Sequence, residues 1–194
     1  QPNLMKKFDT IIFDLDGVLI DSKNIHYTAL NKALEKTKIN YSISFEDHLK
    51  IFDGLPTNEK LKLLLEKKII KKKHFSKIKK EKNKITDDLF KKQISYNKNI
   101  FELFKKLSKK YKLGVATNAI ENTLKLSLKR LKIKNFVNSA VSNQNLTFAK
   151  PHPEIYLRSL LNLKSMPKNT LILEDSHYGR IAAKESGCNL MPIK

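Results

Sequence analysis

The chain has 194 residues, of which 40% are hydrophobic and 30% are charged, a balance typical of a globular protein with one large domain, or with one domain and a smaller insert. No apolar run in the sequence approaches the length of a membrane span and no secretory signal is evident, so no membrane association is expected. The single cysteine, Cys188, excludes an internal disulfide and is expected to be a small apolar residue. A reducing, cytoplasmic location fits this cysteine usage.

The formal net charge of +20 raises the question of a nucleic-acid partner. The lysines spread along the whole chain, and the densest basic run, residues 67–84, contains one aromatic residue, Phe75, and no recognisable binding module. We interpret this run as a solvated helical face and expect no nucleic-acid partner. Salt-dependent retention on DNA or RNA tests the opposite reading. The charge is expected to attract small anionic molecules.

Five short apolar runs predict β-strands over residues Phe8–Phe13, Leu113–Ala116, Phe136–Val141, Thr170–Leu173 and Asn189–Ile193. Most are apolar throughout rather than alternating, which is typical of a parallel sheet covered on both faces. Patterns with helical spacing lie between the later strands, over residues 99–111, 123–133, 153–163 and 177–187. This alternation predicts a doubly wound, Rossmann-like α/β fold.

One segment interrupts the alternation. Between the first strand and the strand at Leu113, residues 22–98 show helical patterns and no convincing strand, with a turn at Gly54–Pro56. A single crossover helix needs far fewer residues. We therefore predict an all-helical cap over residues 22–98, inserted into an α/β core made of residues 1–21 and 99–194.

Polar side chains follow each of four predicted strands. They are Asp14 and Asp16, then Thr117 and Asn118, then Lys150, and finally Glu174 and Asp175. Ligands bind beyond the carboxyl ends of the strands in an open parallel sheet, so these groups are expected to converge on one site.

The chemistry of the set is that of phosphoryl transfer. Several carboxylates without clustered cysteine or histidine suit Mg²⁺. An aspartate can attack phosphorus to give an aspartyl phosphate, and Gly17 permits the tight turn that brings Asp16 over the site. Lys150 supplies a cation, and Thr117 can hold phosphate oxygens.

The motifs "DLDGVLIDS", "ATN", "KPHPEIY" and "EDSHYGRIAAKESG" resemble those of the haloacid dehalogenase superfamily. The helical insert after the first motif is similar to the cap of its β-phosphoglucomutase and phosphoglycolate phosphatase branch. The resemblance implies a role for each residue of the set. These roles are Asp14 as nucleophile and metal ligand, Asp16 as general acid/base with its main-chain carbonyl on the metal, Thr117, Asn118 and Lys150 as phosphate ligands, Asp175 as a Mg²⁺ ligand, and Glu174 as its support.

Two cap positions are compared with the same branch. His26 matches a histidine at the start of the cap in sugar-phosphate members, which implies a substrate role, and Thr57 stands where mutases carry an arginine. Asp21 and Ser22 are interpreted as a turn or helix cap. The other histidines show no metal-ligand spacing and are interpreted as surface or packing residues. They are His48, His74, His152 and His177.

The leading hypothesis is a monomeric, Mg²⁺-dependent phosphatase that acts on a small phosphorylated metabolite, of the sugar phosphate or phosphoglycolate type. The first alternative is a mutase that resembles β-phosphoglucomutase. The second is a non-catalytic binding module or a fragment of a larger enzyme, because related proteins continue past the last strand with at least one more helix.

Overall fold

The computed structural model describes residues 8–144 and 146–194, and the predicted core residues 1–7 lie outside this range. Its strands form one sheet in the order β3-β2-β1-β4-β5, and every pair of neighbours is parallel. The strands are β1 (Thr10–Phe13), β2 (Lys112–Ala116), β3 (Ser139–Val141), β4 (Thr170–Glu174) and β5 (Asn189–Pro192). The predicted α/β class and parallel sheet are confirmed.

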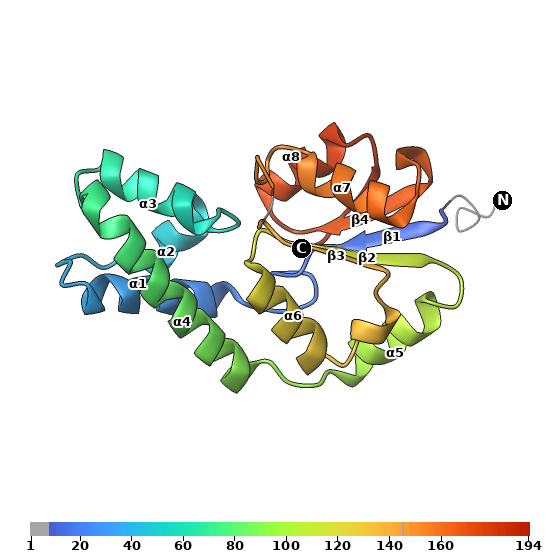
Figure 1. Cartoon of the computed structure of the whole chain (residues 1–194), viewed down its shortest axis with the longest axis horizontal. Coiled ribbons are helices and arrows are strands. Elements are labelled where there is room, and N and C mark those ends of the chain that lie inside the picture. Colours follow the sequence, from blue (N-terminus) through green and yellow to red (C-terminus); the bar gives the residue numbers. More distant parts are fainter. Residues whose placement is uncertain (1–7, 145) are drawn as a thin grey trace.

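Helices cover both faces of the sheet, because successive side chains of a strand point to opposite faces. The ring of Phe13 in β1 packs on Phe104 of α5 (Lys98–Leu107), with 4.8 Å between the ring centroids. The adjacent Ile12 belongs to the cluster on the other face, with Tyr156 of α7 (Glu154–Leu163). Figure 1 shows α5 and α6 (Glu121–Arg130) below the sheet, and α7 and α8 (His177–Glu185) above it.

The third strand is shorter than predicted. Its expected start lies in the 3-10 turn η4 (Lys134–Phe136), and only Ser139–Val141 pairs with β2. The main-chain N–H groups of Phe136 and Val137 bond back to Ile133 and Lys134, over 2.9 and 3.3 Å. These local hydrogen bonds remove the donors that a longer strand would need. A second 3-10 turn, η5 (Pro167–Asn169), precedes β4.

The segment over residues 23–93, between β1 and α5, is helical apart from its turns, as predicted. Its elements are α1 (Lys23–Lys36), α2 (Phe45–Asp47), the π-helical turn η2 (His48–Phe52), α3 (Thr57–Glu66), the 3-10 turn η3 (Lys72–His74) and α4 (Phe75–Gln93). They share a hydrophobic cluster of their own, which includes Leu30, Phe52, Leu61 and Ile78. This cluster supports a division into cap and core near residues 22 and 98, which we propose. The two parts still meet, because Ile25 of α1 and Phe90 of α4 belong to the core cluster around Phe13.

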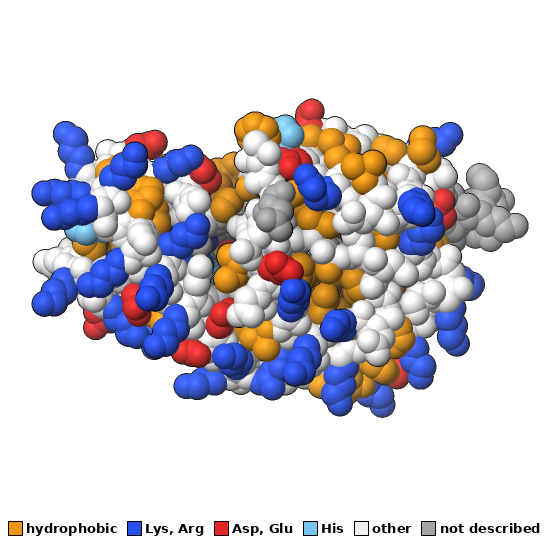
Figure 2. All heavy atoms as spheres, viewed as in Figure 1, with side chains coloured by type: hydrophobic (Ala, Val, Ile, Leu, Met, Phe, Trp, Pro, Cys, Tyr) orange, Lys and Arg blue, Asp and Glu red, His pale blue; other side chains and the backbone are white. Residues whose placement is uncertain are grey.

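The basic run at residues 67–84 is largely exposed, and Figure 2 shows lysine side chains over much of the cap surface. Lys82 departs from the prediction of a solvated face. It is 6% exposed, on the buried side of α4 with Ile78 and Ile85. Within residues 8–144 and 146–194, no helix is long and apolar enough to cross a membrane.

Candidate active site

The first strand ends on the two aspartates, and the chain then turns sharply. The main-chain N–H of Asp14 donates to the carbonyl of Leu173 over 3.0 Å, which continues the hydrogen bonding between β1 and β4. The next residue, Leu15, is fully buried. Gly17 has φ +86°, a conformation that favours glycine. A Cβ atom at Gly17 would overlap the carboxylate of Asp175. Glycine is therefore required here on two counts, and it lets the β4 carboxylate approach the β1 loop.

A buried ion cluster joins three strand ends. The Lys150 ammonium lies 2.5 Å from Asp14 Oδ1 and 2.8 Å from Glu174 Oε2, and it donates to the carbonyl of Ala116 over 3.2 Å. Burial and the Glu174 carboxylate hold the pKa of Asp14 well above its usual value, although Lys150 opposes them. Burial alone would lower the pKa of Lys150, but the carboxylates of Asp14 and Glu174 outweigh it and raise this pKa well above its usual value.

Glu174 is the anchor of this cluster. It is fully buried, and its Oε2 accepts from the Tyr156 hydroxyl over 2.6 Å as well as from Lys150. Its Oε1 accepts from the N–H and the hydroxyl of Ser176, over 3.0 and 2.9 Å. Both oxygens are thus occupied, which suits a residue that positions Lys150.

Asp14, Glu174 and Asp175 can hold a metal ion, because their ligand oxygens lie within 4.8 Å of one another. Asp175 Oδ1 is buried and has no hydrogen-bond partner among the described residues, while Oδ2 lies 3.5 Å from the half-exposed ammonium of Lys23. Three carboxylates face one buried ammonium, so negative charge is in excess. An orphaned carboxylate oxygen in such a cluster fits a hard divalent cation.

The Asp16 side chain lies outside this group of three. It accepts from the Ser22 hydroxyl, from His26 Nε2 at 3.2 Å and from the Thr117 hydroxyl at 3.4 Å. Burial raises the pKa of Asp16, but the His26 ring and the hydrogen bonds from His26 and Ser22 outweigh it and lower this pKa to about 2. Asp16 is therefore ionised at neutral pH.

His26 is held against Asp16 as a neutral ring. Burial lowers its pKa below the usual 6.5, more than Asp16 raises it, so at pH 7 the Nε2–H donates to Asp16. Its Nδ1 is buried without a partner in the described part of the chain. Ser22 stands at the N-cap of α1, in line with the interpretation as a turn or helix cap. Its hydroxyl, however, donates to Asp16 and makes no hydrogen bond to the helix.

The second strand places Thr117 and Asn118 beside the aspartates. Besides donating to Asp16, the Thr117 hydroxyl accepts from the Ala119 N–H over 3.0 Å. The Asn118 side chain donates to the carbonyl of Gly54 in the cap over 2.9 Å and accepts from the Lys150 N–H over 3.3 Å. Asn118 therefore links the cap loop, the second strand and the Lys150 loop.

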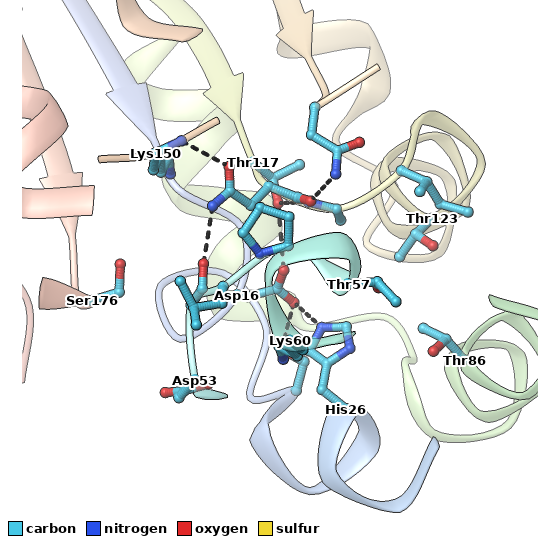
Figure 3. Close-up of a pocket in the computed structure, with 18 of the residues that line it drawn as sticks. Asp16, His26, Asp53, Thr57, Lys60, Thr86, Thr117, Thr123, Lys150 and Ser176 are labelled. Atoms are coloured by element: carbon cyan, nitrogen blue, oxygen red, sulfur yellow. Dashed lines mark hydrogen bonds and ion pairs between the residues drawn. The ribbon is translucent and has the colours of Figure 1, made fainter. Parts of the chain in front are cut away.

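A pocket runs between the core and the cap, and it brings together all the predicted site residues except the anchor Glu174. Figure 3 shows His26 and Lys60 next to Asp16, on the side away from Lys150. Thr57 lines the pocket from the start of α3. The sequence reasoning missed Ser22, Asp53, Lys82 and Thr86, which also line it. A signal for the burial of Lys82 was its spacing, because it lies four residues after Ile78 and three before Ile85, on the same face of the helix.

The remaining histidines are not brought together. His48 is buried beside Tyr27 and Phe45, and burial and the charge of Lys60 lower its pKa to about 3. His152 and His177 are exposed, and His74 accepts from the Lys71 N–H. Cys188 is half-buried against an apolar cluster, as expected.

The sequence profile of the haloacid dehalogenase-like hydrolases matches residues 11–193. The chain belongs to this family. It is 31% identical to the phosphorylated carbohydrates phosphatase of Thermotoga maritima over 182 residues, which cover 92% of this chain and 82% of that protein. It is 27% identical to the pyrophosphatase PpaX of Anoxybacillus flavithermus, over 92% of this chain and 80% of that protein.

The crystal structure of β-phosphoglucomutase from Clostridium difficile superposes with a TM-score of 0.84 at 26% identity, over 96% of this chain and 85% of that one. The family expected from the four motifs is thus confirmed, and so is the Rossmann-like architecture. This haloacid dehalogenase-like protein is an enzyme of the phosphatase type.

Proposed function

We propose that the chain is a Mg²⁺-dependent phosphatase that hydrolyses a small phosphorylated metabolite through a phosphoaspartate at Asp14. The observation that carries the proposal is the pairing of Asp14 with the buried ammonium of Lys150, next to the orphaned oxygen of Asp175. The names of the relatives point to phosphorylated carbohydrates or pyrophosphate as substrates.

In the first step, an Asp14 oxygen attacks phosphorus while the bond to the leaving oxygen breaks. Asp16, which is ionised in the empty site, takes up a proton from the solvent when the phosphate ester binds, and it then gives this proton to the leaving oxygen. The negative charge of the bound phosphate raises the pKa of Asp16 and favours the protonated form that this step needs. Lys150, Thr117 and Asn118 would hold the phosphate oxygens and offset the charge.

In the second step, a water oxygen attacks phosphorus and Asp14 leaves as a free carboxylate. Asp16, restored as a base, takes the proton of the water. The hydrogen bonds from Ser22 and His26 hold the Asp16 carboxylate in the pocket for both steps. The cap side of the pocket excludes bulk water while the phosphoryl group is transferred.

The metal would be held by the side chains of Asp14 and Asp175 and by the main-chain carbonyl of Asp16. When bound, Mg²⁺ neutralises charge on the transferring phosphoryl group and the carboxylates. Glu174 supports this group through Lys150 and Ser176 rather than as a ligand.

The proposal is tested by phosphate release from a panel of phosphorylated metabolites in Mg²⁺. Asp14→Asn is expected to abolish turnover, while Asp21→Asn, an exposed residue in the same loop, keeps it. Acid quenching during turnover is expected to trap one phosphoryl group on the Asp14 peptide, found by mass spectrometry. Chelation of Mg²⁺ is expected to remove activity reversibly. Full activity in Asp14→Asn contradicts the assignment.

The mutase alternative is favoured by one observation, the likeness to the β-phosphoglucomutase structure. Against it, Thr57 stands where such mutases carry arginine, and Lys60 follows one turn later. A lysine binds phosphate as a point charge and lacks the fork of arginine. The non-catalytic alternative is opposed by the full set of charged groups at the site.

A further inference from the structure

A tyrosine lies fully buried beside the ion cluster of Asp14, Lys150 and Glu174. Tyr156 ends the motif "KPHPEIY" and lies on α7, and none of its surface is exposed. Burying a hydroxyl is costly unless it makes a hydrogen bond. The Tyr156 hydroxyl donates to Oε2 of Glu174 over 2.6 Å. Burial raises the pKa of Tyr156 well above its usual value, so the hydroxyl keeps its proton and remains a donor.

The ring of the same tyrosine faces the cation of the cluster. The Lys150 ammonium lies 5.0 Å from the centroid of the Tyr156 ring, within the range of a cation–π contact. Tyr156 therefore contacts both members of the Lys150–Glu174 ion pair, the carboxylate through its hydroxyl and the ammonium through its ring. The side chains of Lys150 and Glu174 are 3% and 0% exposed, so solvent screens these contacts little.

The Glu174 carboxylate is restrained from several directions. Its Oε2 is shared between Tyr156 and Lys150, while its Oε1 accepts from Ser176. Gly179 of α8 leaves room for this carboxylate, since a Cβ atom there would overlap it. Without the tyrosine hydroxyl, Lys150 would be the one remaining donor to Oε2 among the described residues. The hydroxyl therefore restrains the carboxylate independently of the lysine.

Lys150 needs this restraint because its ammonium stands at the end of a flexible four-carbon stem. The same ammonium lies 2.5 Å from Asp14 and 2.8 Å from Glu174, so a shift of Glu174 changes its place relative to Asp14. A cation that is held in place before the reaction stabilises a transferring phosphoryl group better than one that must first be ordered. The position of Glu174 thus bears on the chemistry at Asp14.

We propose that Tyr156 is a positioning residue, which holds Glu174 through its hydroxyl and Lys150 through its ring, and so aims the Lys150 ammonium at the phosphate beside Asp14. The inference rests on the proposed function in one respect, that the phosphate lies beside Asp14. Tyr156 is fully buried and does not line the pocket, so it acts on the phosphate through Lys150. A phenylalanine would keep the ring contact but would take one donor from Glu174.

Tyr156→Phe tests the hydroxyl alone. Its kcat/KM for p-nitrophenyl phosphate in Mg²⁺ is expected to fall about tenfold, since a hydrogen bond to a charged group contributes on that scale. The matched control is Thr10→Val, at the start of β1 and so at the opposite end of the strand from Asp14. The Thr10 hydroxyl is also buried and donates to a carboxylate, Asp9 Oδ1, over 2.7 Å. Thr10→Val is expected to keep the native kcat/KM.

Two further readouts do not depend on turnover. Calorimetric titration of inorganic phosphate in saturating Mg²⁺ is expected to show about tenfold weaker binding in Tyr156→Phe and native binding in Thr10→Val. The ¹⁵N NMR signal of the Lys150 ammonium, assigned by its loss in Lys150→Arg, reports how firmly this group is held. Its protons are expected to exchange with water severalfold faster in Tyr156→Phe only. A purely structural role would change the midpoint of urea unfolding and neither of these readouts.

The inference is overturned if Tyr156→Phe binds phosphate as the native protein does, if it loses no more affinity than Thr10→Val, or if its Lys150 signal is unchanged. Its failure is distinguishable from that of the proposed function. If the native protein hydrolyses no ester, yet phosphate binding and the Lys150 signal change in Tyr156→Phe alone, the positioning role stands and the phosphatase proposal fails. If esters are hydrolysed and Tyr156→Phe matches Thr10→Val in every measurement, the positioning role fails and the phosphatase stands.

Discussion

The side-chain amide of Asn118 donates a hydrogen bond to the main-chain oxygen of Gly54 over 2.9 Å, and so joins the end of β2 to the loop before α3 in the cap. A second contact joins α4 to α6, where Asp87 accepts from Asn122 over 2.6 Å and from Thr123 over 3.1 Å. The two contacts draw the cap onto the core at separate points. We interpret these contacts as a closed arrangement of cap and core.

Closure of this kind predicts motion at the two connections of the cap, residues 18–22 and 94–97. Phosphate ester with Mg²⁺ is expected to slow hydrogen exchange there, because ligand bound between cap and core favours the closed form. Asp87→Ala removes one contact and is expected to speed exchange in the empty enzyme. Mass spectrometry of the exchanged peptides measures both effects. Unchanged exchange at saturating ligand would indicate a fixed cap.

The contact of Gly17 with Asp175 predicts a loss of function that exceeds the loss of stability. Gly17→Ala is expected to cost about 1–2 kcal/mol of unfolding free energy for the left-handed backbone alone, and to displace the Asp175 carboxylate. Gly187→Ala is the matched control. It has φ +74°, but its Cβ would meet only Pro167, at 3.6 Å.

Chemical denaturation and phosphate release are measured on both glycine variants. Both are expected to lose similar stability from backbone strain, while only Gly17→Ala loses most of its activity and its affinity for Mg²⁺. Equal activity in the two variants would show that Asp175 tolerates displacement.

Much of the core could be predicted from the sequence, because continuous apolar runs such as Ile11–Phe13 and Leu113–Ala116, set between helical patterns, are typical of a parallel sheet covered on both faces. The polar residues at the strand ends then follow from the geometry of such sheets. The predicted start of the third strand, at Phe136, is too early. The local hydrogen bonds of Phe136 and Val137 depend on backbone geometry that composition does not reveal.

His26 and Thr57 could be placed on the cap side of the pocket from the sequence, but Lys82 and Ser22 could not. Lys82 lies within a run of lysines, and only the packing of α4 decides which of them is buried. The role of Ser22 was also hidden, because a serine before a helix usually caps that helix. Its contact with Asp16 depends on the path of the chain after Gly17.

The burial of Lys60 predicts a pH-dependent stability. Its pKa is about 7 in the folded protein and about 10.5 when unfolded, so between these values the unfolded chain binds more protons and stability rises with pH. Below pH 7 the folded protein carries the full cost of the buried charge. Lys60→Met is therefore expected to stabilise the empty protein at pH 7 by about 1–3 kcal/mol.

The gain is expected to shrink as the pH rises towards 10, where Lys60 is neutral in the folded state. Urea unfolding at pH 6, 7, 8.5 and 9.5 measures it for the native protein, Lys60→Met and the exposed control Lys62→Met. A Lys60→Met gain that stays constant with pH would mean that it arises from apolar packing and not from the removed charge.

The last prediction separates hydrolysis from isomerisation, the two fates of a phosphoryl group on Asp14. A mutase must hold a bisphosphate by its distal phosphate, a task suited to the bidentate fork of arginine. Thr57 offers only a hydroxyl at that position. We expect β-glucose 1-phosphate with a trace of glucose 1,6-bisphosphate to yield free phosphate faster than glucose 6-phosphate.

Product analysis by chromatography decides the matter, with Thr57→Arg as the informative variant. If the missing fork is what prevents isomerisation, Thr57→Arg is expected to raise the ratio of glucose 6-phosphate to free phosphate. Thr57→Ser keeps the hydroxyl and serves as its control. Glucose 6-phosphate formed faster than phosphate by the native enzyme would place the chain among the mutases.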